Sequence, residues 1–116
     1  MKIEEIKKLV IEKFPKYVDV EYDYRDNKAL SNGIGSMWER IDNFDSGLKE
    51  NFEKFLKNGE LPEAEIKGWS IKRLIEERGM DPVGAFIMYD WLMRDSRQAV
   101  EALAEGYDII SEWKKK

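Results

Sequence analysis

The stretch Asp81–Asp95, DPVGAFIMYDWLMRD, constrains the fold of this chain more than any other part of it. Nine of its fifteen residues are apolar or aromatic, and they lie on every side of a helix rather than along one face. A helix with that pattern normally has neighbouring elements all around it. Asp81 can accept from the free N–H groups of a first turn, and Pro82 suits the first helical position, where its missing N–H has no effect. The sequence therefore predicts a buried central helix over 82–94.

A buried strand is the alternative for the same run, because periodicity alone does not separate the two, but the run is too long for a usual strand. Asp95 and Gln98 form the capping-box pattern that starts a new helix just beyond it. Asp90 is the one acid inside the run. We expect Asp90 at the rim of the core, because burying an unpaired carboxylate is costly. A buried pair with Arg94, four residues later, is the alternative.

Amphipathic patterns predict further helices on both sides of this segment. Apolar residues recur at helical spacing, with Pro15 ending the first pattern and Gly59 and Gly79 suited to the left-handed ends of two others. The predicted helices span 2–14, 36–43, 46–57, 70–79 and 96–114, with one bent helix over 36–57 as the alternative to two. The expected fold is mainly α, with five to six helices in a single helical domain over 1–116.

The segment 17–24, YVDVEYDY, changes to a period of two. Its apolar and aromatic residues alternate with acids, which is typical of a strand with one wet face. The sequence therefore predicts a short β-strand or hairpin near 17–30. Pairing of this strand with its copy in a second chain predicts a two-fold homodimer.

The composition excludes several kinds of chemistry. The chain has 116 residues, a net charge of −4 and neither His nor Cys. It therefore lacks Ser-His-Asp and Cys-His nucleophiles, structural zinc ligands and histidine acid–base groups. The N-terminus does not resemble a signal peptide, and no apolar run has the length of a bilayer span. We expect a cytoplasmic protein without cofactor or membrane contact.

The acids on the predicted strand suggest an oxygen-ligand metal site, but their spacing argues against it. An EF-hand loop needs Gly at its sixth position, where this chain has Tyr24. Alternate residues of a strand lie about 7 Å apart, which is too far for two acids to share one ion. We therefore predict no metal site, and interpret the acids as a solvated strand face or as contacts for a partner.

The segment 70–94 has the outline of a helix-turn-helix, with Gly79 at the turn. A recognition helix should present polar side chains such as Arg, Asn or Gln to base edges. The second helix here carries Phe, Ile, Met and Trp instead, and the acidic chain lacks a basic groove for phosphates. We expect no nucleic-acid binding.

Three tryptophans, Trp38, Trp69 and Trp113, lie at the ends of predicted elements. Trp is enriched in interface hot spots, but it is also a common core residue with its ring N–H at the rim. We expect these rings to be core residues.

These observations favour a small acidic protein-interaction or regulatory protein that is not an enzyme and that binds another protein. An alternative is an inhibitor or immunity-type protein whose acids occupy a partner's basic nucleic-acid-binding surface, because a spacing of about 7 Å is near the phosphate repeat. A third class is a Mg²⁺-dependent carboxylate enzyme, which needs acids that converge in a cleft. The predicted partner-binding residues are Asp19, Glu21, Asp23 and Asp26, with Glu39 and Asp42 as further candidates.

Overall fold

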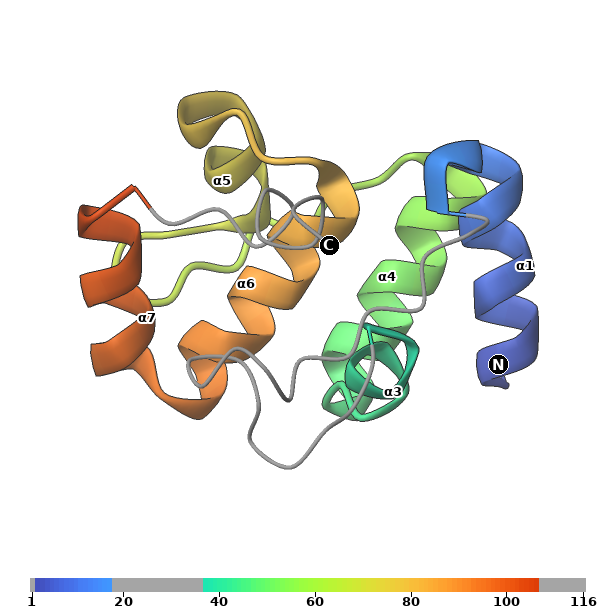
Figure 1. Ribbon diagram of the computed structural model, residues 1–116, viewed down its shortest axis with the longest axis horizontal. Coiled ribbons are helices and arrows are strands. Elements are labelled where there is room, and N and C mark those ends of the chain that lie inside the picture. Colours follow the sequence, from blue (N-terminus) through green and yellow to red (C-terminus); the bar gives the residue numbers. More distant parts are fainter. Residues whose placement is uncertain (1, 18–36, 107–116) are drawn as a thin grey trace. The chain divides into compact units, whose positions relative to one another are not determined.

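The computed structural model describes residues 2–17 and 37–106, and in these residues the protein is mainly helical (Figure 1). They contain six α-helices and one 3₁₀ helix, and no β-strand. The mainly α prediction and the expected number of helices are confirmed. The chain divides into two units, residues 1–60 and 61–116. The organisation as a single domain stays a prediction. The predicted strand or hairpin lies outside the described residues, except for Tyr17.

The first unit begins with α1, Ile3–Lys13, which confirms the helix predicted over 2–14. Its buried side, with Ile6 and Val10, packs against α3 and α4. Pro15 cannot continue the helix, and it begins the 3₁₀ helix η1, Pro15–Tyr17. The ring of Phe14 stacks on that of Phe55 in α4, with centroids 6.3 Å apart. Aromatic packing therefore fixes the C-terminal end of α1 against α4.

The segment 36–57 forms two helices, α3, Met37–Asp42, and α4, Ser46–Asn58. The two-helix prediction is confirmed, and the bent helix is excluded. Asp45 causes the new start, because its carboxylate accepts a hydrogen bond from the backbone N–H of Gly47 at 3.1 Å. Phe44, between the helices, is buried and packs edge-on against Phe52, with centroids 5.9 Å apart. The chain therefore turns between α3 and α4 at a residue that caps α4, and Phe44 in this turn packs into the core of the unit.

The second unit contains α5, Ile71–Arg78, α6, Pro82–Arg94, and α7, Ser96–Ala104. Each begins at a side-chain cap, and the sequence predicts those of α6 and α7. The acceptors are Ser70 for the N–H of Arg73 at 3.1 Å, Asp81 for that of Val83 at 2.9 Å, and Asp95 for that of Gln98 at 3.2 Å.

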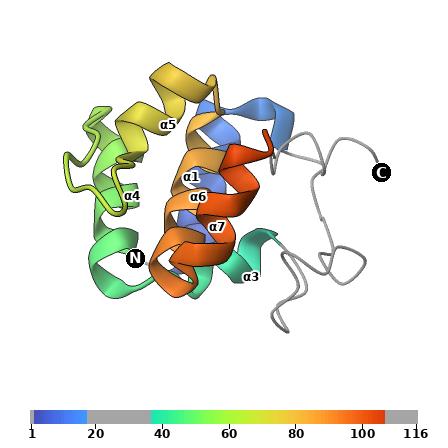
Figure 2. The ribbon, with the colours of Figure 1, turned by 90° about the vertical axis from the view of Figure 1, so that its left-hand side faces the viewer.

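Helix α6 is buried on all sides, as its sequence predicts. Every residue from Val83 to Leu92 is buried, and both α5 and α7 pack against this helix (Figure 2). The side chains from Val83 to Leu92 are therefore part of the core and not of the surface. Within residues 2–17 and 37–106, no helix combines the length and the apolar composition that a bilayer crossing requires.

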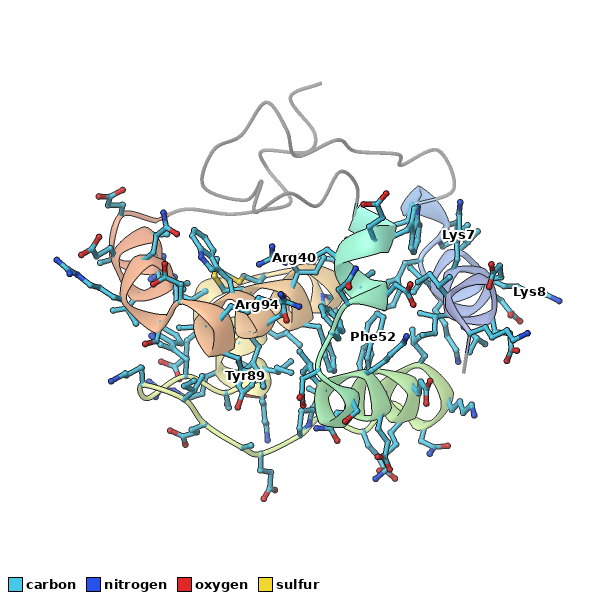
Figure 3. All side chains as sticks on the ribbon, turned by 90° about the horizontal axis from the view of Figure 1, so that it is seen from below. Lys7, Lys8, Arg40, Phe52, Tyr89 and Arg94 are labelled. Carbon is cyan, nitrogen blue, oxygen red and sulfur yellow. The ribbon has the colours of Figure 1, made fainter. Side chains whose placement is uncertain are left out.

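Asp90 corrects the prediction of a rim position, because it is only 2% exposed. The Arg94 Nε donates to both of its carboxylate oxygens, at 3.0 and 3.1 Å, so the alternative of a buried pair is the one observed. Both residues belong to α6, and Figure 3 labels the Arg94 side chain that projects from it. Four residues of helix bring the guanidinium over the carboxylate, and this pairing makes the burial of the charge tolerable.

The last helix is shorter than the sequence predicts. Helix α7 ends at Ala104, and Gly106 follows with a φ of 81°. A left-handed residue cannot continue a right-handed helix, and glycine adopts this conformation without a steric penalty. Gly106 therefore ends the helix instead of lying within it. The remainder of the predicted helix, from 107, lies outside the described residues.

Candidate functional site

The acids predicted to contact a partner do not form a site that the structure describes. Asp19, Glu21, Asp23 and Asp26 lie outside the described residues. Glu39 and Asp42, the further candidates, are exposed on α3. The Asp42 carboxylate is 2.9 Å from the Lys49 ammonium, which neutralises part of its charge. Across 2–17 and 37–106, no three acids, histidines or cysteines converge as a metal site would require.

The most distinctive surface feature is a tight turn at Ile66–Trp69, just before α5. Ile66 and Trp69 exchange two backbone hydrogen bonds, each 2.9 Å long. The two central residues are both left-handed, with φ of 53° at Lys67 and 83° at Gly68. This is the pattern of a type I′ turn, which favours Asn, Asp or Gly at its centre. Lys67 is the only non-glycine residue with positive φ among the described residues, so the turn holds a lysine in an unfavourable backbone state.

The ring of Trp69 is braced by two arginines of α5. The guanidinium carbon of Arg73 lies 5.2 Å from the ring centroid and that of Arg78 lies 5.9 Å away, within the range of cation–π attraction. Trp69 is half-buried, whereas its neighbours Lys67 and Gly68 are exposed. We call Trp69, Arg73, Glu77 and Arg78 the tryptophan–arginine cluster.

Arg73 is held in place by two further contacts. Its Nη1 donates to the carbonyl of Gly68, and its Nη2 donates to Glu77 Oε1 at 3.1 Å. The hydrogen bond with Arg73 lowers the pKa of Glu77, and the same contact raises the pKa of Arg73. Arg78 has no acidic group within 4 Å among the described residues. The cluster therefore combines one fixed guanidinium with one that can contact a partner.

Lys67 supplies a direct test of the turn geometry. Replacing it with Asn creates Asn-Gly, the pair that type I′ turns favour most, and should raise the free energy of unfolding by about 0.5–1 kcal/mol. Urea denaturation measures the change. Gly68→Ala is the matched opposite, because its φ of 83° is strained for any side chain, and it should lower stability by about 1–2 kcal/mol. A destabilising Lys67→Asn would contradict the assigned turn.

An open hollow lies between this turn and α7. It has a volume of about 390 Å³ and is lined by Lys67 from the turn and by Ser96, Arg97, Val100 and Glu101 from α7. Arg97 and Glu101 form an exposed ion pair with a separation of 3.6 Å. The side of α7 next to buried Ala99 and Leu103 thus borders a depression with two cations and one carboxylate on its walls.

Tyr89 on α6, which Figure 3 labels, has a phenol whose pKa is shifted. Burial raises its pKa above the ordinary value of 10.0, and the charge of Glu65 raises it further. The folded state therefore favours the neutral phenol. The stabilisation that comes from holding the phenol neutral is complete below pH 10.0 and is lost as pH rises through the raised pKa of Tyr89.

We expect the free energy of unfolding to fall as pH rises above about 10, and Tyr89→Phe to make this fall shallower. Urea denaturation at a series of alkaline pH values gives the comparison. Glu65→Gln should keep most of the fall, because burial is the larger cause of the shift. Parallel curves for wild type and Tyr89→Phe would refute the assignment.

The prediction that the tryptophans are core residues is confirmed for Trp38 but only partly met by Trp69. Trp38 is buried, as expected of a core residue, and the Lys7 ammonium lies 5.3 Å from its ring centroid. Figure 3 shows Lys7 beside α3 and Lys8 pointing away from α1. Trp69 is only half-buried, and Trp113 lies outside the described residues. The helical pattern alone does not predict the turn that precedes Trp69, although Gly68 directly before it is a usual turn signal.

Comparison of the chain with protein-family models, with curated proteins and with solved structures finds no significant match.

Proposed function

We propose that this chain is a non-catalytic protein-binding module and that the tryptophan–arginine cluster forms its main contact surface. The observation that carries the proposal is a half-buried Trp69 ring with two guanidinium carbons 5.2 and 5.9 Å from its centroid, on a turn closed by two backbone hydrogen bonds. Trp and Arg are the residue types most enriched in interface hot spots. A fixed ring loses little side-chain entropy on binding, which favours affinity.

The composition supports a non-catalytic role and a cytoplasmic location. Without His and Cys the chain lacks the usual nucleophiles and neutral-pH bases. Zero Cys also fits a reducing compartment. The partner in this proposal is another protein, and the acidic net charge of −4 disfavours nucleic acid.

Affinity capture with the full chain as bait tests the proposal. Proteins retained by the wild type should be lost with Trp69→Ala and with Arg78→Glu, because truncation of a hot-spot residue costs about 2 kcal/mol or more, or roughly thirtyfold in affinity. Arg78→Glu keeps the Trp69 ring, so it separates binding from folding. Lys8→Glu, an exposed charge change on α1, is the control and should retain the same proteins. Equal retention by all four baits would refute the proposal.

The alternative of an immunity-type inhibitor uses a different set of residues and can be separated in the same experiment. It predicts that neutralising Asp19, Glu21 and Asp23 together abolishes capture, while Trp69→Ala leaves it intact. The third class, a Mg²⁺-dependent enzyme, predicts that millimolar Mg²⁺ or Mn²⁺ raises the melting temperature. Under the proposal made here, neither change is expected.

A further inference from the structure

The hollow between the turn and α7 has properties that differ from those of a small-molecule pocket. Ligand pockets of similar volume are enclosed and lined mainly by apolar and aromatic side chains. Among the described residues, Val100 is the one wholly apolar residue on the wall, and the carbon atoms of the four polar or charged residues form much of the remaining surface, which is open to solvent. An open wall of this kind suits an extended segment of another protein, whose aliphatic side chain contacts Val100 while its polar groups remain near solvent.

Lys67 contributes the first argument for the charge of that segment. It is exposed at the tip of the turn, with a φ of 53°, where Asn or Gly would be preferred. Strained backbone positions of this kind occur preferentially at functional sites. No carboxylate lies within 4 Å of the Lys67 ammonium among the described residues. A lysine kept there at a cost in stability places a positive charge at the edge of the hollow.

Arg97 contributes the second argument. Its side chain is 91% exposed and its Nε is 3.6 Å from Glu101. Exposed ion pairs of this kind contribute little to stability, so Arg97 can exchange Glu101 for another carboxylate with little loss. Two cations and one carboxylate thus give the hollow a positive balance within a chain of net charge −4.

We infer that the hollow lined by Lys67, Ser96, Arg97, Val100 and Glu101 binds a segment of a partner protein in which an aliphatic side chain is flanked by carboxylates. The inference rests on the proposed protein-binding function and deepens it. The aliphatic side chain contacts Val100, and the carboxylates contact Lys67 and Arg97. The hydroxyl of Ser96 offers a further hydrogen bond. The complementary charge on the partner provides orientation and a faster association.

The test uses the full chain labelled with ¹⁵N and three synthetic hexapeptides of alternating sequence: Leu-Asp, Leu-Asn and Leu-Lys repeats. The Leu-Asp peptide should shift the amide signals of Lys67, Arg97 and Val100, and the other two should not. Lys67→Asn should weaken its binding by about fivefold, which corresponds to one exposed charge contact. This variant is expected to be more stable than the wild type, so unfolding does not explain the loss. Lys72→Gln, an exposed lysine on α5, is the matched control and should bind as the wild type does.

Three results would overturn the inference: no shift of these amides at millimolar Leu-Asp peptide, equal binding of the Leu-Asn or Leu-Lys peptide, or equal affinity of Lys67→Asn. Self-association of the chain that Lys67→Asn abolishes would also overturn it, because the occupant would then be a second copy. If Trp69-dependent capture of a partner survives in a Lys67→Asn/Arg97→Gln variant, the inference fails while the proposed function stands. The opposite outcome is also informative. If no bait captures a protein, and the Leu-Asp peptide still shifts the amide signals of the hollow, the proposed role of the tryptophan–arginine cluster fails and the inference about the hollow stands.

Discussion

Replacing Phe86 with alanine is expected to lower the free energy of unfolding by about 3–5 kcal/mol. Phe86 lies in the middle of α6 and is 0% exposed. The change removes a large apolar side chain from a closely packed site, and the surrounding helices can fill the resulting cavity only in part. Because domains are stable by only about 5–15 kcal/mol, this single substitution removes a large share of the total. Urea denaturation followed by far-ultraviolet circular dichroism measures it.

Met93 is the control for this prediction, because it lies on the same helix but is 42% exposed. Met93→Ala should lower the free energy of unfolding by less than about 1 kcal/mol, since much of its surface is already in water. A Phe86→Ala effect no larger than that of Met93→Ala would show that α6 is not enclosed. The same denaturation curves also test the single-domain prediction, which requires one cooperative transition for the whole chain.

Replacing Arg94 with methionine is expected to lower the free energy of unfolding by about 2–3 kcal/mol. The substitution keeps an unbranched side chain of similar length but removes the guanidinium that donates to both oxygens of Asp90. Asp90 is 2% exposed, so water replaces these charge-assisted contacts poorly. The expected effect is below the full value for a buried pair because Arg94 itself is 38% exposed.

Arg97→Met provides the matched control. Arg97 also pairs with an acid four residues along the helix, Glu101, but the two side chains are 91% and 64% exposed. Its loss should change stability by less than about 0.5 kcal/mol. Thermal or urea denaturation of both variants compares a buried pair with an exposed one, since the substituted residue and the spacing of four residues are the same. Equal effects for Arg94→Met and Arg97→Met would contradict the interpretation of Asp90 as a buried, paired carboxylate.

The helix limits were largely predictable because their causes are local. Ser70, Asp81 and Asp95 act through hydrogen bonds to N–H groups two or three residues away. Gly59 and Gly79 end helices with φ of 74° and 66°, which follows from the absence of a side chain. Such signals are contained in a few consecutive residues and need no knowledge of distant contacts.

The errors have physical causes that sequence spacing does not contain. The cost of burying a carboxylate predicts a rim position for Asp90, yet the geometry of α6 brings Arg94 close enough to compensate. The apolar period continues past Gly106 and therefore predicts a longer last helix, but the backbone becomes left-handed at that glycine. The candidate surface was missed because Lys67 belongs to a residue type that rarely adopts the conformation it has in the turn.

By itself, the sequence determined the mainly helical class, the caps of α6 and α7, and the burial of α6, because propensity, capping and apolar content all act over short distances. Only the tertiary structure decided that Asp90 is buried with Arg94, that Arg73 and Arg78 meet the ring of Trp69, and that Lys67 shares a hollow with α7. Contacts between side chains depend on the three-dimensional path of the backbone, including one strained turn, and a linear pattern of residue types does not record that path.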